Sequence, residues 1–325
     1  MTENNSLTRN HTVYTDLVIY DPPPLDQHPA AVYLYGLNSE RSRRVMAQSL
    51  RAIAALLTGQ DAQTVDILRL NWSAIGYPHT AALKTRLLES YSPATANRIL
   101  SALRGVLKEA WRLGQMSAES YQRAVDVQNV KSETLPAGRE LSQGELLALV
   151  SACKADRSPA GIRDAAIIGL LYTCGLRRAE LVALDRSDFD PATGKLAVRA
   201  GKGRKQRMVY VQGGALCALT DWLAAVGDSL PLFVPVRKDG RITRRRMNPQ
   251  SIYDMLKKRA RQSGVSEFSP HDLRRTFVGD MLDRGVDIAT VASIAGHASV
   301  DTTRRYDRRP EETKRQAAGK LHFPY

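Results

Sequence analysis

Pro270-His-Asp-Leu-Arg-Arg-Thr-Phe277 is the stretch that decides how the second half of this chain is read. Pro270 suits the first turn of a helix, because the backbone N–H that proline lacks would have no partner there. His271 and Arg274 are three residues apart, so they lie on one face of that helix. Taken alone, such a pair is common on helix surfaces. Its significance depends on the residues that come after it in the chain.

Two further motifs lie within thirty residues of this helix. The apolar-periodic segment 286–295 predicts a second helix that stops at Gly296-His297, and Ser299 or Asp301 can cap a third helix that carries Tyr306. Imidazole, guanidinium and phenol groups are thereby presented by successive short helices. Arginine binds phosphate oxygens in a planar bidentate manner, and histidine donates or accepts protons near neutral pH. The combination favours chemistry on a phosphate ester.

The order and spacing of these motifs resemble the C-terminal signature of the tyrosine recombinase (phage integrase-like) family. That signature reads His-x-x-Arg, then Gly-His, then a tyrosine. Two upstream stretches, 173–181 and 201–207, resemble the first arginine box and the β-turn lysine of the same family. The resemblance covers roughly residues 140 to 320. It implies six catalytic positions, which are Arg177, Lys202, His271, Arg274, His297 and Tyr306.

The resemblance also implies roles for these six residues. Tyr306 would be the nucleophile, and the two arginines would clamp the non-bridging oxygens of the scissile phosphate. Lys202 would protonate the leaving oxygen, while the histidines would act as base or hydrogen-bond donors. Glu180 is expected to orient Arg177 from one turn away, although an exposed ion pair between positions i and i+3 explains the spacing nearly as well.

The fold class implied by the family is mainly α with a small β-sheet, arranged as a two-domain C-shaped DNA clamp. We expect an N-terminal arm over 1–37 and a helical core-binding domain over 38–126. A linker over 127–140 would then lead to a mixed α/β catalytic domain over 141–325 that ends in a C-terminal helix.

Local patterns predict the individual elements. Serine or asparagine before proline or a periodic run predicts helix starts, and β-branched runs around a glycine-rich turn predict a hairpin. The expected helices begin near 39 and 142 or cover 62–70, 80–89, 92–113, 117–125, 162–172, 177–184, 214–226, 248–264, 286–295 and 311–321, and the expected strands cover 195–199, 207–211 and 232–234.

The chain is strongly basic, with a net charge of +14 over 325 residues and an isoelectric point near 9.9. Such a balance favours a polyanionic partner such as DNA, although a solvated charged surface is the alternative for any single cluster. The candidate DNA-binding residues are Arg41, Arg43, Arg44, Arg98, Arg104, Lys108, Arg204, Lys205, Arg244 and Arg245.

The three cysteines are widely spaced and form neither a disulfide framework nor a metal-ligand pattern, which indicates a reducing cytoplasm. Cys174 adjoins the first arginine box, where a buried structural thiol is expected rather than a nucleophile. We expect no cofactor and no metal. The sequence shows neither a signal peptide nor a membrane-spanning run, so a cytoplasmic, nucleoid-associated protein is expected.

These observations favour a site-specific DNA recombinase that cuts strands through a 3′-phosphotyrosyl bond and exchanges them by way of a Holliday junction, as in mobile elements. The expected partners are double-stranded DNA with an inverted-repeat core site, three further copies of the chain in a tetramer, and accessory DNA-bending proteins. Two alternatives stay open: a non-catalytic DNA-binding protein of the same fold, and a nicking enzyme like type IB topoisomerases.

Overall fold

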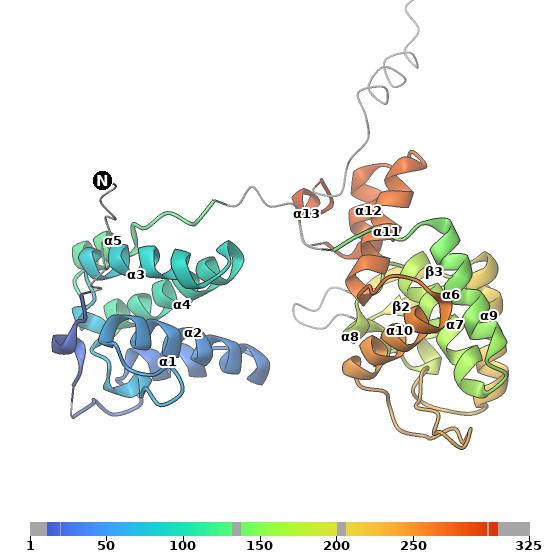
Figure 1. Ribbon diagram of the computed structural model, residues 1–325, viewed down its shortest axis with the longest axis horizontal. Helices are drawn as coiled ribbons and strands as arrows, with labels where there is room; N and C mark the ends of the chain where they lie inside the picture. Colours follow the sequence, from blue (N-terminus) through green and yellow to red (C-terminus); the bar gives the residue numbers. More distant parts are fainter. Residues whose placement is uncertain (1–11, 20, 132–137, 200–205, 298, 305–325) are drawn as a thin grey trace, which may run out of the picture. The chain divides into compact units, whose positions relative to one another are not determined.

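The structure is a computed structural model that describes residues 12–19, 21–131, 138–199, 206–297 and 299–304. The chain divides into two compact units, Met1–Leu135 and Pro136–Tyr325 (Figure 1). Each unit has its own hydrophobic core. No helix in the described ranges is both long enough and apolar enough to cross a membrane.

The first unit is all-helical. Ser39 caps α2 by accepting a hydrogen bond from Ser42 N at 3.1 Å, and Pro93 occupies the first turn of α4. The apolar face of α4, with Ile99, Leu103 and Val106, is buried in the core of the unit. The α-helices are α1 (Pro29–Tyr35), α2 (Glu40–Thr58), α3 (Tyr77–Ser90), α4 (Pro93–Arg112) and α5 (Ala118–Val125).

The predicted N-terminal arm over 1–37 is wrong for its described part. Leu17 is almost fully buried in the core of the first unit, and α1 packs there through Ala30. His28 holds α1 in place, because one ring nitrogen accepts from Ala30 N and the other meets Leu68 O at 3.0 Å. A helix of seven residues is too short to reveal itself by periodicity.

The predicted helix over 62–70 is also wrong, because only the 3₁₀ turn Ile67–Arg69 forms there. Asp61 accepts a hydrogen bond from Gln63 N, and Asp66 accepts one from Leu68 N, both at 2.9 Å. Such aspartate turns satisfy the backbone locally and compete with helix formation. The segment is apolar enough for a helix, but its two aspartates favour turns.

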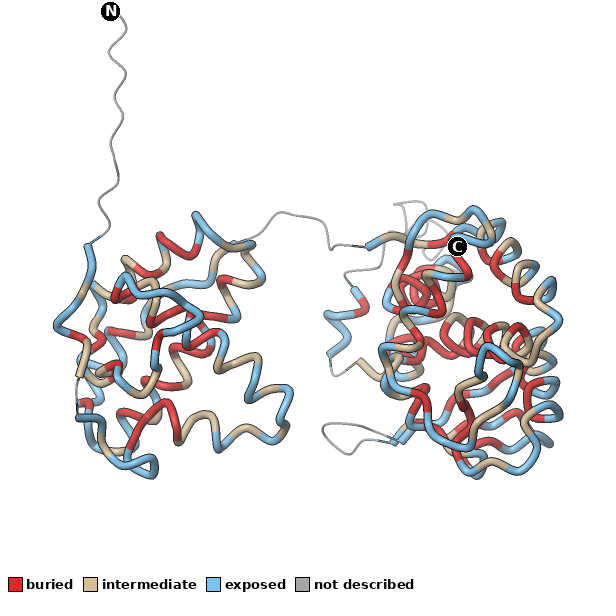
Figure 2. The backbone as a smooth tube through the Cα atoms, turned by 60° about the horizontal axis from the view of Figure 1, so that its bottom comes forward, coloured by how far each residue is buried: buried red, intermediate tan, exposed pale blue. Residues whose placement is uncertain are grey.

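The second unit is built around α7, which packs between α6 and α9. Figure 2 shows the buried residues gathered inside this unit. Ser142 and Glu145 form the predicted capping box of α6, and Asn248 caps α10 by accepting from Ser251 N at 2.8 Å. The helices are α6 (Gln143–Ala155), α7 (Pro159–Thr173), α8 (Arg178–Ala183), α9 (Gly213–Val226), α10 (Pro249–Ser263), α11 (Pro270–Asp283), α12 (Ile288–Ala295) and α13 (Val300–Arg304).

A small antiparallel sheet completes the second unit, with strand order β1-β2-β3. The predicted hairpin is present as β2 (Lys195–Val198) and β3 (Arg207–Tyr210), and β1 (Phe189–Asp190) is too short to have been predicted. The strand predicted at 232–234 is absent. Those apolar residues are buried in a loop instead, where Leu232 O accepts a hydrogen bond from Trp222 Nε1 at 2.8 Å.

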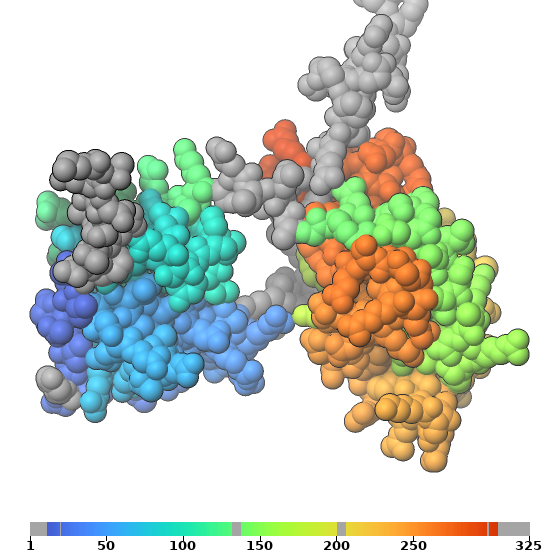
Figure 3. Space-filling view, in the orientation of Figure 1, coloured from blue at the N-terminus to red at the C-terminus, as the bar shows by residue number. Residues whose placement is uncertain are grey.

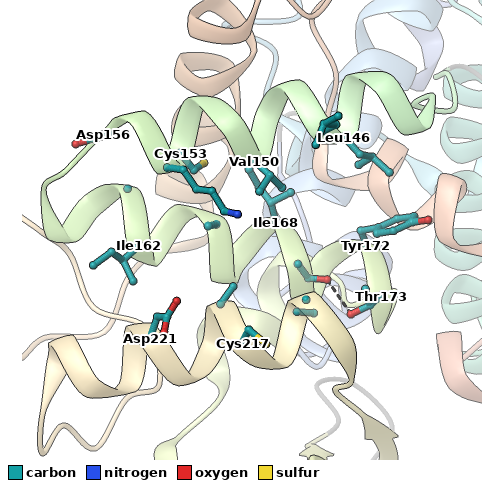
Figure 4. A pocket seen from close by; sticks show the side chains of 18 of the residues that line it. Leu146, Val150, Cys153, Asp156, Ile162, Ile168, Tyr172, Thr173, Cys217 and Asp221 are labelled. Atoms are coloured by element: carbon teal, nitrogen blue, oxygen red, sulfur yellow. Dashed lines mark hydrogen bonds between the residues drawn. The ribbon is translucent and has the colours of Figure 1, made fainter.

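Figure 3 shows the surface of each unit in the orientation of Figure 1. A groove of about 850 Å³ runs along α6, α7 and α9 (Figure 4). Apolar side chains in this groove include Leu146 and Val150 of α6 and Ile162 of α7. Cys217 and Asp221 line it from α9. None of the predicted catalytic residues within the described ranges lines this groove. The groove is therefore separate from the place where those residues lie.

Candidate functional site

Arg177 stands at the start of α8, where it is the N-cap residue. Gly175, just after the end of α7, turns the chain there with a φ of 56°. Glu180 accepts hydrogen bonds from Arg177 N at 2.9 Å and from Arg177 Nη1 at 2.6 Å. The Arg177 side chain is 47% exposed, so Glu180 fixes one end of a guanidinium that remains open to solvent.

The helix α11 carries His271 and Arg274 on one face, as their spacing predicts. Ser269 and Asp272 form the capping box that starts this helix next to Pro270. Arg274 is only 3% exposed, and its Nη1 donates to Gly175 O at 2.7 Å. The turn before α8 therefore holds Arg274 in place through Gly175 O and leads directly to Arg177.

His297 comes after the end of α12, where Gly296 adopts a left-handed conformation with a φ of 67°. Its Nδ1 lies 2.7 Å from Oγ1 of Thr303, which is fully buried on α13. Gly296 O accepts a hydrogen bond from Arg177 Nη2 at 3.0 Å. This contact joins the first arginine box to the Gly-His motif across 119 positions of sequence.

Arg177, His271 and Arg274 line one cavity of about 330 Å³. The turn that carries His297 is joined to the same place by the hydrogen bond from Arg177 to Gly296 O. Burial and the nearby charges of Arg274 and Arg177 lower the pKa of His297 to about 4. Four of the six predicted residues are thus gathered at one place. The other cavity residues are Leu176, Arg178, Tyr253, Ser269 and Pro270.

Both histidines are neutral near pH 7. Burial is the main cause of the lowered pKa of His271, and Arg274 and Arg275 add to the effect. A neutral imidazole can accept a proton or donate one hydrogen bond without adding charge. The positive charge of the cavity therefore comes from its arginines, and the imidazoles add none.

Arg207, at the start of β3, is a site residue that sequence reasoning missed. It donates to both oxygens of Glu180, at 3.1 and 2.7 Å, and to Ile294 O at 2.7 Å. Burial disfavours the Glu180 carboxylate, but the hydrogen bonds from Arg207 and Arg177 outweigh it and lower the pKa of Glu180 to about 2. Glu180 is therefore an anion shared by two arginines.

Tyr306 and Lys202 lie outside the described residues, as do Arg204 and Lys205. Among the described basic candidates, Arg41, Arg43, Arg98, Lys108, Arg244 and Arg245 are exposed. Arg44 is exposed too and pairs with Glu40 at 2.9 Å.

Arg104 differs from the other described basic candidates, because it is half-buried and bonded to the segment after α5. It donates to Asn129 Oδ1 at 2.9 Å and to Val127 O, while Asn97 on the same helix bonds Val130 through both backbone groups. Arg104 thus ties the segment after α5 to α4. It has this internal role in addition to the DNA contact predicted for it, which stays a prediction.

The two buried thiols of the second unit are unreactive, as expected for Cys174. Burial raises the pKa of Cys174 to about 11 and that of Cys153 to about 12, so neither forms a thiolate near neutral pH. Among the residues that the structure describes, no three His, Cys, Asp or Glu side chains are grouped so that they could hold a metal ion.

Comparison with known families decides the identity of this arrangement. The family model "Phage integrase family" matches residues 139–312, which is more than half of the chain. The chain belongs to the phage integrase family. It is a tyrosine site-specific recombinase, and its relatives bear that name.

Among these relatives, the tyrosine recombinase XerA of Pyrococcus furiosus is 33% identical over 243 residues, which cover 71% of this chain and 82% of XerA. The tyrosine recombinase XerD of Pseudomonas aeruginosa is 30% identical over 292 residues, covering 87% and 92% of the two chains. The similarity to XerD therefore extends well beyond the catalytic unit.

Solved structures share the fold of this recombinase at low sequence identity. The Tn1549 transposon integrase in complex with a circular intermediate DNA aligns with a TM-score of 0.67 at 15% identity, over 93% of this chain and all of the other. A lambda integrase tetramer bound to a Holliday junction aligns with a TM-score of 0.64 at 15% identity, over 88% and 78% of the two chains. The expected class, mainly α with a small sheet, is confirmed.

Proposed function

We propose that this recombinase cuts one strand of each of two duplexes through a 3′-phosphotyrosyl bond and exchanges the strands by way of a Holliday junction, on behalf of a mobile element. The observation that carries the proposal is that Arg177, His271 and Arg274 line one small cavity, while Arg177 also bonds the turn that carries His297. Two arginines and two neutral imidazoles suit a phosphodiester, whose transition state gains negative charge.

In the proposed step, the phenolic oxygen of Tyr306 attacks phosphorus and its proton passes to His271. The bond from phosphorus to the 5′ oxygen breaks, and Lys202 gives that oxygen a proton. Arg177 and Arg274 neutralise the non-bridging oxygens throughout. A neutral His271 can accept the phenolic proton, and its lowered pKa keeps it neutral near pH 7.

His297 serves in this scheme as a hydrogen-bond donor to a phosphate oxygen. When Thr303 donates its hydroxyl proton to Nδ1, the imidazole carries its remaining proton on Nε2. The phosphotyrosine ester keeps the free energy of the broken bond, so a 5′ hydroxyl from the partner strand can reverse the reaction. Strand exchange then needs no external energy source.

Double-stranded DNA with an inverted-repeat core site is the proposed substrate, and a tetramer on two such sites is the proposed assembly, with accessory DNA-bending proteins as further partners. The exposed arginines of α2 and the net charge of +14 support a polyanionic partner. A relative in the fold, lambda integrase, has been solved as a tetramer bound to a Holliday junction.

The test is recombination of a supercoiled plasmid that carries two copies of the candidate core site from the DNA flanking the native gene. We expect deletion or inversion products from the wild-type protein and none from Tyr306→Phe, although the variant still binds the site. Relaxation of supercoils without recombinant products would instead indicate a nicking enzyme like type IB topoisomerases. Binding without either product would indicate a non-catalytic DNA-binding protein.

A further inference from the structure

Arg207 lies where three of the motifs meet. It is the first residue of β3, its side chain is only 12% exposed, and its side-chain hydrogen bonds reach beyond the sheet. Two go to Glu180 on α8 and one goes to Ile294 O near the end of α12. One side chain therefore connects the strand after the predicted lysine turn with two other elements of the site.

The bonds of Arg207 run parallel to those of Arg177. Both guanidiniums share the carboxylate of Glu180, and both donate to carbonyls at the end of α12, Arg207 to Ile294 O and Arg177 to Gly296 O. The two arginines thus share Glu180 as a common ion-pair partner. Arg207 is the buried partner of Glu180, and Arg177 is the exposed partner, which lines the cavity.

The packing at Gly296 shows how closely Arg207 approaches α12. A Cβ atom added at Gly296 would lie 2.7 Å from Arg207 Nη1, which is too short for a real contact. The backbone of Gly296 also has a φ of 67°, a conformation that favours glycine. The chain before His297 is therefore fitted against the guanidinium of Arg207.

We propose that Arg207 is a positioning residue, which holds Arg177 and the Gly296-His297 turn at the scissile phosphate through Glu180 and Ile294 O. This inference rests on the proposed function. Without Arg207, Glu180 keeps Arg177 as its charged partner but loses the buried guanidinium that fixes the position of its carboxylate. The end of α12 loses one of its two anchors at the same time. Arg177 and His297 would then shift relative to the phosphate.

An alternative role for Arg207 acts through the β2–β3 hairpin, because its base adjoins the lysine turn. The two roles predict different chemical defects. Misplaced phosphate-binding groups weaken neutralisation of the non-bridging oxygens, whereas a misplaced hairpin weakens protonation of the leaving oxygen. Arg199 offers a matched control on the neighbouring strand end, since its carboxylate partners are Asp188, at 2.6 Å, and Asp185, at 3.8 Å, rather than Glu180.

The experiment measures single-turnover covalent cleavage of a nicked suicide duplex by full-length Arg207→Gln, with Arg199→Gln as control. Each protein is given a normal phosphodiester and a duplex whose scissile phosphate is a methylphosphonate. The methyl group removes the negative charge that the arginines neutralise. A displacement of about 1 Å in the site can cost roughly 10²-fold in rate, and we expect a loss of that order for Arg207→Gln on the phosphodiester.

On the methylphosphonate, the deficit of Arg207→Gln relative to wild type should shrink at least tenfold, while Arg199→Gln stays within about twofold of wild type on both substrates. Arg177→Ala should show the same rescue as Arg207→Gln, and Lys202→Ala should show none. An equal deficit on both substrates, or no deficit at all, would overturn the inference. A deficit removed by a bridging 5′-sulfur leaving group would overturn it too, because sulfur needs no proton and its rescue identifies the hairpin role.

Two further measurements keep the result interpretable. Should Arg207→Gln fail to fold, Arg207→Lys retains the charge but cannot donate to both oxygens of Glu180 and to Ile294 O, so an intermediate, methylphosphonate-sensitive loss is expected. Absence of covalent complex from wild-type protein on either substrate would overturn the proposed function itself, and with it the role of Arg207. Retained binding of uncleaved DNA by Arg207→Gln separates a catalytic defect from a binding defect.

Discussion

Replacing Gly175 by alanine should damage both the stability of the second unit and the chemistry of the site. Gly175 has a φ of 56°, and a Cβ atom there would lie 2.5 Å from Cδ1 of Phe277, which is only 3% exposed. The backbone oxygen of the same residue accepts the hydrogen bond of Arg274. The substitution therefore forces a clash at the residue that positions a phosphate-binding arginine.

The expected cost has two parts. A left-handed backbone costs a non-glycine residue about 1–2 kcal/mol. Forcing a methyl group into a packed core costs about 1–3 kcal/mol more, because a buried ring has little room to move. The free energy of unfolding should therefore fall by about 2–5 kcal/mol in Gly175→Ala.

Gly264→Ala is the matched control. Gly264 ends α10 with a φ of 68°, but a Cβ atom there would meet nothing within 4 Å. In Gly264→Ala, the free energy of unfolding should fall only by the backbone contribution, about 1–2 kcal/mol. Urea unfolding of the full chain gives both values when it is followed by the ¹⁹F NMR signal of 5-fluorotryptophan at Trp222, which reports on the second unit because its ring is buried there and is resolved from the signals of Trp72 and Trp111.

Covalent cleavage of the suicide duplex supplies the second readout. Gly175→Ala should cleave roughly 10²-fold more slowly than wild type under conditions where the variant is still folded, because Gly175 O and Arg274 shift together. Gly264→Ala should cleave at the wild-type rate. A Gly175→Ala protein that is no less stable than Gly264→Ala, and equally active, would refute the assigned packing of Gly175 against Phe277 and its link to Arg274.

Three further predictions concern the histidines and the DNA-binding surface. Thr303→Val removes the hydroxyl that bonds to His297 without changing the size of the side chain, and it should slow cleavage about 5–10-fold, which is the contribution of one hydrogen bond. The same change at exposed Thr302 should have no effect, and equal rates for the two variants would contradict the role of Thr303. In the DNA-free protein, the imidazole NMR signals of His297 should stay constant from about pH 8 to about pH 6 and shift as the pH falls further toward 4, and a titration midpoint near 6.5 would contradict this. Because the folded pKa lies below the ordinary 6.5, the folded state binds fewer protons than the unfolded state, so the stability of the protein should rise with pH between about 4 and 6.5. Arg98→Ala combined with Lys108→Ala should reduce the slope of log binding constant against log salt by about 1–2, measured by titration with site DNA at several salt concentrations, and an unchanged slope would remove α4 from the DNA-binding surface.

Local signals in the sequence predicted most helices of this fold. Ser142 with Glu145 and Asn248 with Pro249 carry their capping signals within three residues, so the helix starts that they predict are found in the structure. The errors occur where tertiary partners decide. The segment that contains α1 is held by contacts to α4 and by the hydrogen bond of His28 with Leu68 O, and neither partner is visible in the local sequence.

The candidate site shows the same division between local and long-range information. The spacing of His271 and Arg274 is a local property, whereas their common cavity with Arg177 exists only once α11 and the turn before α8 come together. Arg207 looked like one of several basic residues after a turn. Its place in the site depends on Glu180, 27 positions away, and on Ile294, 87 positions away. No local pattern could have distinguished it from Arg199.

The central claim is that Tyr306 becomes covalently joined to a 3′ phosphate of DNA, and one measurement tests it directly. The covalent product of wild-type protein and a nicked suicide duplex is digested with protease and nuclease, and the nucleotide-bearing peptide is identified by mass spectrometry. We predict a 3′-linked nucleotide on the peptide that contains Tyr306, and no adduct from Tyr306→Phe. An adduct on any other tyrosine of the chain, or one linked through a 5′ phosphate, would contradict the account.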